Sequence, residues 1–519
     1  MYLTQGLHRA LRHTPERPAT IFGDRIRSVA EHADRVARLA GGLHTFGVSD
    51  GERVAILSLN SDRYCELLLA VPWADGVLNP VNVRWSPAEI VYSLVDSDTS
   101  LLVVDDTFAP LVPELREGHP GLRTVIHAGD GDAPDELVAY EELATGPAAV
   151  PDARRGGDAA AGVFYTGGTT GFPKGVVLTH ANLLTSALGS QATCPWVVPG
   201  GRGLLAAPLF HAAGLAPWLV QSVVGGTHVL LPAFDPVAVM RAIAAHRVTS
   251  TVLVPTMLQR VVDHPDLGRH DLTSLRILLY AGSAIGEALL LRAIEALPAT
   301  DFVQAYGMTE LGPIATMLTA EDHRRGDRLR SAGRAAVHAE VRVVDEVGNE
   351  APRGTVGEVA VRGGHVMAGY WAKPKETAAA VRGDWMHTGD AGYMDDAGYV
   401  FIVDRLKDMI VSGGENVYSV EVENALSRHP AVAACAVIGV PDLDWGERVH
   451  AVVVLEPGAR ATLDDLRAHV TAAIAGYKAP RSVEFVDELP VSGAGKVQKA
   501  QLRARPSRAF DTAGHGGRR

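Results

Sequence analysis

Residues 165–176 read YTGGTTGFPKGV, and this stretch says more about the fold than any other part of the chain. Its glycines let the backbone approach an anion closely and adopt positive φ angles. Threonine hydroxyls and backbone N–H groups donate to phosphate oxygens, and Lys174 adds a positive charge. The apolar residues at 159–165, AAAGVFY, predict a strand that presents this phosphate-binding loop.

The loop has two other possible interpretations. A glycine- and threonine-rich stretch can be a flexible turn that binds nothing. A Walker A loop requires Gly, four residues and then Gly-Lys-Ser/Thr. Here Phe172 and Pro173 precede Lys174, and Gly175 follows it. A Walker-type NTPase is therefore disfavoured, and a different class of phosphate loop is expected.

Apolar segments typical of buried strands alternate with segments of helical spacing. The strand candidates are 54–59, 101–105, 228–232 and 250–255, and the helix candidates are 86–97 and 235–246. Asp235 followed by Pro236 matches an N-cap and a first helical position. Such alternation predicts a parallel sheet covered by helices.

The pattern changes near residue 390. Residues 390–416 contain short strands punctuated by glycines, as in hairpins. A helix is expected in 418–430, a buried strand in 431–442, and a second helix from Thr462, with Asp465 placed as in a capping box. We therefore expect an α/β fold: a large N-terminal domain of helix-covered sheets at 1–403, a hinge at 404–408, a small α+β C-terminal domain at 409–505, and a disordered tail at 506–519.

Composition limits the function classes. The 519 residues are too many for one ordinary core, and the formal net charge of -12 gives no general attraction to nucleic acid or anionic membrane. Cys65, Cys194 and Cys435 lie far apart, so a cytoplasmic location is expected. The first residues do not read as a signal peptide, and no apolar run reaches the roughly 20 residues of a membrane span. The sequence does not indicate an oligomeric state.

The complete loop resembles the signature of the adenylate-forming superfamily, which includes acyl-CoA synthetases, luciferases and peptide-synthetase adenylation domains. Further matching segments follow in the family's order: APLFHAAG (207–214), YAGSAIG (280–286), QAYGMTE (304–310), GEVAVRG (357–363), WMHTGD (385–390), DRLKDMIVSGGEN (404–416) and LPVSGAGKVQK (489–499). The chain departs from the family at Gly167, where Ser is usual, so the loop has one hydroxyl donor fewer.

The resemblance implies an enzyme that uses ATP and Mg²⁺ to convert a small-molecule carboxylic acid into an acyl-adenylate and then a thioester. The implied catalytic residues are Lys496, His211, Thr309, Glu310 and Lys407. The implied ATP-binding residues are Thr166, Gly167, Gly168, Thr169, Thr170, Gly171, Lys174, Ser283, Ala284, Tyr306, Gly307, Asp390 and Arg405, and Thr166 and Glu310 are the metal candidates. Tyr306 would stack on adenine, Asp390 would accept the ribose hydroxyls, and Lys496 would bridge the attacking carboxylate and the α-phosphate.

The resemblance also implies a mobile C-terminal domain that turns about Lys407. The turn would exchange Lys496 for the loop 412–416, whose Gly413 and Gly414 would border a pantetheine tunnel. Arg84, Trp445 and Arg481 match positions that meet coenzyme A in related ligases. An acyl carrier protein, which presents the same thiol, is the alternative acceptor.

The acyl pocket is expected around His211, Gly214, Pro255, Gly282 and Ala305. The segments near them contain small, uncharged residues and no cation to pair a second carboxylate, so dicarboxylates are disfavoured. An apolar monocarboxylic acid is expected, either a medium or long fatty acid or an aryl acid such as a cinnamate. A nucleotide-binding protein without turnover is disfavoured, because Glu310, Asp390 and Lys496 are all present.

Overall fold

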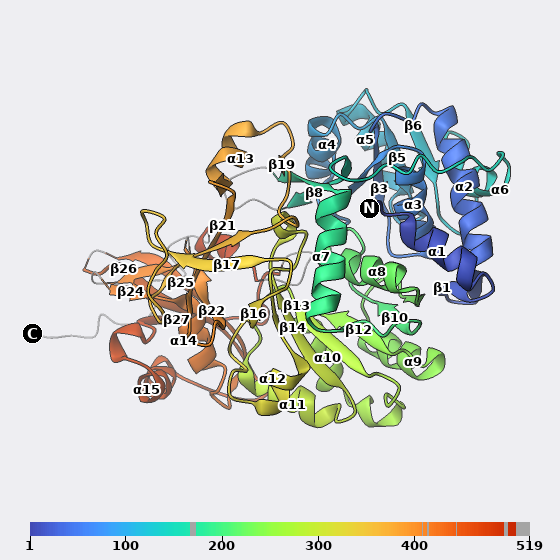
Figure 1. The fold of residues 1–519 in the computed structure, drawn as a ribbon. Helices are drawn as coiled ribbons and strands as arrows, with labels where there is room; N and C mark the ends of the chain where they lie inside the picture. Colours follow the sequence, from blue (N-terminus) through green and yellow to red (C-terminus); the bar gives the residue numbers. More distant parts are fainter. Residues whose placement is uncertain (167–172, 407, 413–414, 443, 492–496, 505–519) are drawn as a thin grey trace, which may run out of the picture.

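The computed structural model describes residues 1–519 except 167–172, 407, 413–414, 443, 492–496 and 505–519 (Figure 1). The α/β class is confirmed, with a large N-terminal part built on sheets and a smaller C-terminal part. The predicted tail at 506–519 lies outside the described residues. So do nine of the predicted site residues: Gly167, Gly168, Thr169, Thr170, Gly171, Lys407, Gly413, Gly414 and Lys496.

The first large sheet has nine strands in the order β16-β15-β14-β13-β12-β10-β11-β1-β2. The strands from β14 to β1 run parallel, whereas β15, β16 and β2 pair antiparallel at the two edges. The bounds are β1 Pro18–Phe22, β2 Arg25–Ser28, β10 Arg202–Leu205, β11 Thr227–Leu230, β12 Ser250–Leu253, β13 Ile277–Ala281, β14 Asp301–Tyr306, β15 Thr316–Leu318 and β16 Arg334–Ala335.

The second large sheet has eight strands in the order β19-β9-β8-β4-β3-β5-β6-β7. Here β9 and β19 run antiparallel to their neighbours, and the other strands are parallel. The bounds are β3 Arg53–Leu57, β4 Val77–Pro80, β5 Leu101–Val104, β6 Thr124–His127, β7 Val138–Ala139, β8 Ala160–Thr166, β9 Lys174–Thr179 and β19 Gly369–Tyr370. The predicted parallel arrangement is thus found twice, with antiparallel edges that the alternation of strands and helices did not indicate.

Two helices, α7 (His180–Thr193) and α8 (Ala212–Val224), lie between these sheets (Figure 1). Both helices and both sheets contribute to one buried apolar cluster, which includes Leu183, Leu184, Leu215, Trp218, Val54, Ile56, Val252, Leu279 and Val303. Burial of the apolar side chains in this cluster is the main stabilising contribution to the layer. It holds the two sheets in a fixed relation.

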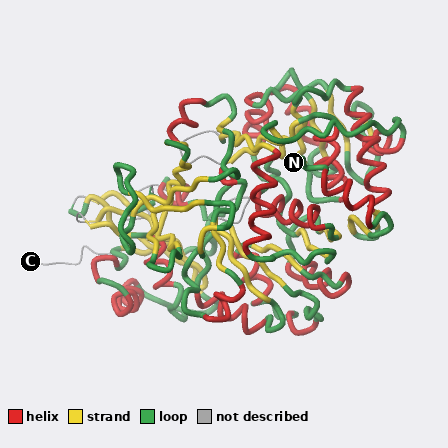
Figure 2. The backbone as a smooth tube through the Cα atoms, viewed as in Figure 1, coloured by secondary structure: helices red, strands yellow, loops and turns green. Residues whose placement is uncertain are grey.

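The other helices lie mainly on the outer side of the sheets (Figure 2). They are α1 Gln5–His13, α2 Val29–Thr45, α3 Asp62–Trp73, α4 Pro87–Asp96, α5 Val112–Gly118, α6 Tyr140–Thr145, α9 Pro236–His246, α10 Pro255–Val262, α11 Glu287–Ala296 and α12 Ala320–Arg325. The predicted start of α9 is confirmed, because Asp235 accepts a hydrogen bond from the Ala238 N–H at 2.7 Å. Since α10 begins at Pro255, the strand predicted at 250–255 ends two residues early, at Leu253.

An antiparallel sheet follows at Glu340, well before the change of pattern near residue 390. It contains β17 Glu340–Val344, β18 Gly357–Arg362, β20 Val381–Arg382, β21 Trp385–Met394 and β22 Val400–Arg405, with α13 at Pro374–Ala380. The hairpin predicted after residue 390 is the pair β21–β22.

The C-terminal part has its own sheet and apolar core, around Ile410, Val437, Val449 and Leu466. Its elements are β23 Ile410–Ser412, β24 Glu415–Val417, α14 Ser419–Leu426, β25 Val432–Asp442, β26 Gly446–Leu455, α15 Leu463–Ala473, β27 Ser482–Phe485 and α16 Lys499–Arg503. The capping box of Thr462 and Asp465 at the start of α15 is confirmed. Arg428 and Glu287 form an ion pair at 3.0 Å between the two parts. Among the described residues no helix is both long and apolar enough to cross a bilayer.

Candidate active site

The predicted site residues gather where parallel strands of the two large sheets end. The carboxyl ends of β10, β12, β13 and β14 lead to His211, Pro255, Gly282 and Tyr306, and β8 ends at Thr166. Ligands of open parallel sheets bind outside the carboxyl ends of the strands. Segments from distant parts of the sequence therefore converge on the edge formed by the carboxyl ends of these strands.

The strands β8 and β9, with the residues between them, form a structure that we call the phosphate hairpin. Thr166 and Lys174 are paired across it, next to the part that lies outside the described residues. Strand β19 extends the sheet beside β9, with Tyr370 opposite Val176. The Lys174 Nζ atom lies 5.1 Å from the centre of the Tyr370 ring, within range of a cation–π interaction.

Three of the predicted nucleotide-binding residues form a single cluster. The Tyr306 hydroxyl donates to Asp390 Oδ2 at 2.7 Å, and Arg405 Nε lies 2.6 Å from Asp390 Oδ1. The hairpin β21–β22 places Asp390 directly opposite Arg405. Burial, and then the neighbouring carboxylate, raise the pKa of Tyr306, so its hydroxyl stays a donor at neutral pH. Both carboxylate oxygens of Asp390 are thus held in a fixed orientation.

Glu310 is the carboxylate that the sequence assigns to a metal. It lies with Thr309 in a short 3₁₀ helix, Thr309–Leu311, after β14, and its side chain is buried. The Tyr370 hydroxyl donates to Glu310 Oε1 at 3.0 Å. Among the described residues there is no cluster of three or more metal-ligating side chains. Magnesium is commonly held by one or two carboxylates together with substrate phosphates. A buried carboxylate beside the phosphate hairpin fits that requirement.

The predicted acyl-pocket residues lie at or near the ends of helices and strands, where neighbouring groups restrict them. His211 is the N-cap of α8, and its Nδ1 atom accepts a hydrogen bond from the Ala213 N–H at 3.2 Å. Gly282 has a φ of 91°, a left-handed conformation that favours glycine. A Cβ atom on Gly214 would lie 2.2 Å from the carbonyl oxygen of Pro208. Pro255 begins α10, and Ala305 lies buried in β14.

Ser283, Ala284 and Gly307 complete the predicted ATP set. Ser283 and Ala284 are exposed on the turn after β13. Gly307 follows Tyr306, and a Cβ atom there would lie 2.0 Å from the carbonyl oxygen of Pro313. The backbone of Gly307 can lie this close to the backbone of Pro313 only because glycine has no side chain.

Two of the predicted coenzyme A residues meet in the C-terminal part. The Arg481 guanidinium carbon lies 3.6 Å from the centre of the Trp445 ring, and 40% of Trp445 is exposed. Burial lowers the pKa of Arg481. Arg84 lies in the N-terminal part instead, exposed on the turn before α4.

The C-terminal part is tied to β22 by contacts that the sequence did not suggest. The Ser419 N–H and hydroxyl both donate to Asp404 Oδ2, at 2.5 and 2.7 Å. Lys499 in α16 donates to the Ser419 hydroxyl and pairs with Glu423 at 2.8 Å. Arg503 pairs with Asp408 at 2.7 Å. The last helix thus contacts Asp408 at the end of the predicted hinge and Ser419, which is itself bonded to Asp404 at the start of the hinge.

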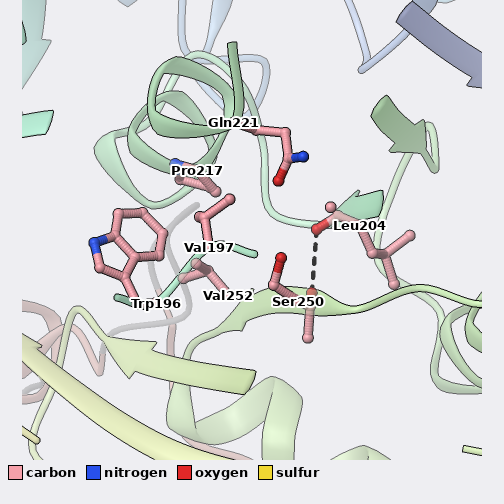
Figure 3. Close-up of a pocket in the computed structure, with 9 residues that line it drawn as sticks. Trp196, Val197, Leu204, Pro217, Gln221, Ser250 and Val252 are labelled. Atoms are coloured by element: carbon pink, nitrogen blue, oxygen red, sulfur yellow. Dashed lines mark hydrogen bonds between the residues drawn. The ribbon is translucent and has the colours of Figure 1, made fainter. Parts of the chain in front are cut away.

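Two hollows in the protein lie away from this edge, near the amino ends of the strands. One has a volume of about 410 Å³ and is lined by residues including Val198, Arg276, Pro298 and Asp301. The other has about 10 Å³, room for one water molecule. In it the side-chain oxygens of Gln221 and Ser250 point toward each other (Figure 3), and neither has a hydrogen-bond partner within the described chain. Neither hollow includes a predicted site residue.

Comparison with known proteins agrees with this geometry. A family model described as "AMP-binding enzyme" matches residues 7–371, and one described as "AMP-binding enzyme C-terminal domain" matches residues 421–496. The chain belongs to the AMP-binding enzyme family. These enzymes form acyl-adenylates, and the chain is therefore an AMP-forming acid–thiol ligase of the ATP-dependent acyl-CoA ligase type.

Individual relatives of this AMP-binding enzyme cover nearly its whole length. A feruloyl-CoA synthase of Amycolatopsis sp. is 42% identical over 96% of this chain and 97% of that protein. A fatty acid–[acyl-carrier-protein] ligase of Streptomyces coeruleorubidus is 37% identical over 95% and 94%. The structure of an anthranilate CoA ligase in complex with anthranoyl-AMP has a TM-score of 0.91 and 28% identity, covering 98% of this chain and 97% of that one.

In this AMP-binding enzyme, several side chains around the phosphate hairpin were not predicted as site residues. The Tyr165 hydroxyl donates to Asp96 Oδ2 at 2.7 Å, and Lys373 donates to Asp96 Oδ1 at 3.0 Å. Tyr370 contacts both Lys174 and Glu310. The only signal in the sequence was the aromatic and basic run GYWAK at 369–373.

Proposed function

We propose that this enzyme joins an apolar monocarboxylic acid to coenzyme A through an acyl-adenylate. A carboxylate oxygen attacks the α-phosphorus of ATP, the bond from that phosphorus to the oxygen that bridges to the β-phosphate breaks, and pyrophosphate leaves. A thiolate then attacks the acyl carbon, the carbon–oxygen bond breaks, and AMP leaves, while the thiol proton passes to solvent. Positioning and charge neutralisation supply most of the catalysis in such steps.

The cluster of Tyr306, Asp390 and Arg405 carries the proposal on the nucleotide side. Contacts at both oxygens orient the Asp390 carboxylate, which is suited to accept hydrogen bonds from the ribose hydroxyls, with the Tyr306 ring beside adenine. Thr309 lies three residues after Tyr306, where it could hydrogen-bond the α-phosphate. Such an arrangement fixes the nucleotide before the acid attacks.

The phosphate hairpin and Glu310 would hold the other end of ATP. Thr166 and Lys174 would contact the β- and γ-phosphates together with the loop at 167–171. Magnesium bound by Glu310 and Thr166 would neutralise phosphate charge. Lys496 would bring its charge to the attacking carboxylate and the α-phosphate.

For the acid, we favour an aryl substrate of the hydroxycinnamate class. The residues around the expected pocket are small and uncharged, which disfavours a second carboxylate. The layer between α8 and the first sheet is filled by buried side chains such as Leu215, Trp218 and Val303, so a compact acid fits better than a long alkyl chain. The similarity to a feruloyl-CoA synthase supports this choice.

A fatty acid transferred to an acyl carrier protein is the second candidate, because one relative is named for that reaction. The chemistry is the same, and only the thiol differs. The stacked pair of Trp445 and Arg481 favours coenzyme A, since an exposed aromatic ring with a cation beside it suits a nucleotide with phosphates.

The test is product analysis with a panel of acids and two thiols. The enzyme is incubated with ATP and Mg²⁺, one of ferulate, benzoate, octanoate, palmitate or malonate, and either coenzyme A or phosphopantetheinylated carrier protein. Nucleotide products and thioesters are then quantified. We expect acid-dependent AMP and pyrophosphate, with feruloyl-CoA formed faster than any other thioester.

Each contrary outcome rejects a stated part of the proposal. Fastest turnover of palmitate would reject the aryl class, and fastest turnover of malonate would reject an apolar pocket. Thioester formation on the carrier protein alone would show that the carrier protein, and not coenzyme A, is the acceptor. ADP and phosphate as products would reject adenylate chemistry altogether.

A further inference from the structure

Tyr370, within residues 369–373, connects two parts of the candidate site. The Tyr370 hydroxyl donates to Glu310 Oε1 at 3.0 Å. The Tyr370 ring lies below Lys174, whose Nζ atom is 5.1 Å from its centre. One side chain thus contacts both the carboxylate proposed for the metal and the lysine proposed for the phosphates.

The position of this tyrosine is itself fixed by several contacts. Its backbone N–H donates to the Thr377 hydroxyl at 2.9 Å, and β19 pairs it with Val176 in the phosphate hairpin. The next residue, Trp371, donates its backbone N–H to the Gly175 carbonyl oxygen at 2.7 Å. Because these contacts hold the backbone on both sides of the ring, Tyr370 has little freedom to shift.

Asp96 anchors the same segment to the other arm of the hairpin. It accepts from Lys373 at 3.0 Å and from the Tyr165 hydroxyl at 2.7 Å, and its carbonyl oxygen accepts from the Trp371 indole at 2.9 Å. Tyr165 is the residue before Thr166, where the described part of β8 ends. Both arms of the phosphate hairpin are therefore tied to residues 369–373.

We infer that Tyr370 is a positioning residue that orients Glu310 toward the metal and sets the place of Lys174 beside the phosphates. The inference rests on the proposed roles of Glu310 and the phosphate hairpin. Groups that hydrogen-bond a metal ligand orient it, and losing one typically weakens metal affinity or activity about 10- to 100-fold. The hydroxyl and the ring act on different partners, so their contributions can be separated.

Tyr370→Phe removes the hydroxyl and keeps the ring. The measurement is calorimetric affinity for ATP with Mg²⁺ and for ATP with a chelator, on the complete chain. We expect Tyr370→Phe to weaken binding of the magnesium complex about tenfold and to leave binding of metal-free ATP unchanged. Tyr370→Leu also removes the ring, so it should weaken binding of both forms.

Tyr399→Phe is the matched control. Tyr399 is buried and donates to the carboxylate of Asp322 at 2.6 Å, outside the candidate site. Tyr399→Phe removes the same kind of hydrogen bond as Tyr370→Phe, so a purely structural effect would appear in both variants. We expect it to bind both forms of ATP as the unmodified enzyme does.

A second comparison tests whether Tyr370 acts through Glu310. In a Glu310→Gln background, Tyr370→Phe should cause no further loss of magnesium-dependent affinity, since coupled residues are not additive. Equal loss for both forms of ATP in Tyr370→Phe, or no loss for either, would overturn the inference. The readout is the affinity for ATP, so this test of Tyr370 stays valid even if the acid panel fails to give the proposed products.

Discussion

Tyr306 donates a hydrogen bond to Asp390 at 2.7 Å across 84 positions of the sequence. The two residues lie in different sheets, at the end of β14 and in β21. Asp390 also pairs with Arg405, so one carboxylate joins two sheets and the strand that leads to the C-terminal part.

Tyr306→Phe should raise the KM for ATP about 10- to 100-fold, because a hydrogen bond to a charged group contributes about 1.5–3 kcal/mol. The aromatic ring remains, so stacking on adenine should survive. Steady-state kinetics with ATP as the varied substrate would measure the change. Tyr399→Phe should leave the KM for ATP unchanged, and an unchanged KM in Tyr306→Phe would separate the cluster from nucleotide binding.

Lys496→Ala should lower acid-dependent ATP–pyrophosphate exchange about 10²- to 10³-fold, the usual cost of removing a charge-stabilising group. ATP should still bind, because the contacts of Tyr306 and Asp390 remain. The control is Lys375→Ala, which removes one exposed lysine from α13. Exchange near the normal rate in Lys496→Ala would mean that another residue supplies the charge.

Lys407→Pro should damage the two half-reactions unequally. Proline fixes φ at about −65° and removes an N–H, so a hinge there loses one of its two geometries. The neighbouring N–H groups of Leu406 and Asp408 donate to the carbonyl oxygens of Gly389 and Arg405. Pyrophosphate exchange and thioester formation from pre-made acyl-adenylate are measured in the same variant.

Asp408→Ala serves as the comparison for the hinge. It breaks the ion pair with Arg503 and leaves the backbone unrestricted, so both half-reactions should change together or hardly at all. Equal losses in Lys407→Pro would show that this residue is not the pivot and that the predicted boundary at 404–408 is misplaced.

Gly214→Ala should lower the free energy of unfolding by about 1–3 kcal/mol, the usual cost of overpacking. The added Cβ atom would meet the Pro208 carbonyl oxygen at 2.2 Å, and backbone cannot move aside as a side chain can. Gly268→Ala is the control, because a Cβ atom there meets nothing within 4 Å. Denaturant unfolding of both variants would show whether the glycine at 214 is required by packing.

Local features of the fold were predictable because neighbouring residues decide them. The N-cap of α9 at Asp235 and the capping box of α15 depend on side chains that bond within three residues. The strand β25 was predictable from its own apolar run, although its pairing was not. Of the antiparallel sheet from Glu340, only the hairpin β21–β22 was predicted, whereas the pairing of β17 and β18 with each other and with β21 is set by partners farther along the chain.

The sequence by itself determined the chemistry that this protein carries: a glycine- and threonine-rich loop with Lys174, the carboxylates Glu310 and Asp390, and strands and helices in an order that places them at one edge. Only the tertiary structure decided which side chains meet, namely Tyr306 with Asp390 and Tyr370 with Glu310 and Lys174. The physical reason is that the period of a strand or helix sets which face a residue occupies, whereas contacts between separate strands depend on how the sheets pack together.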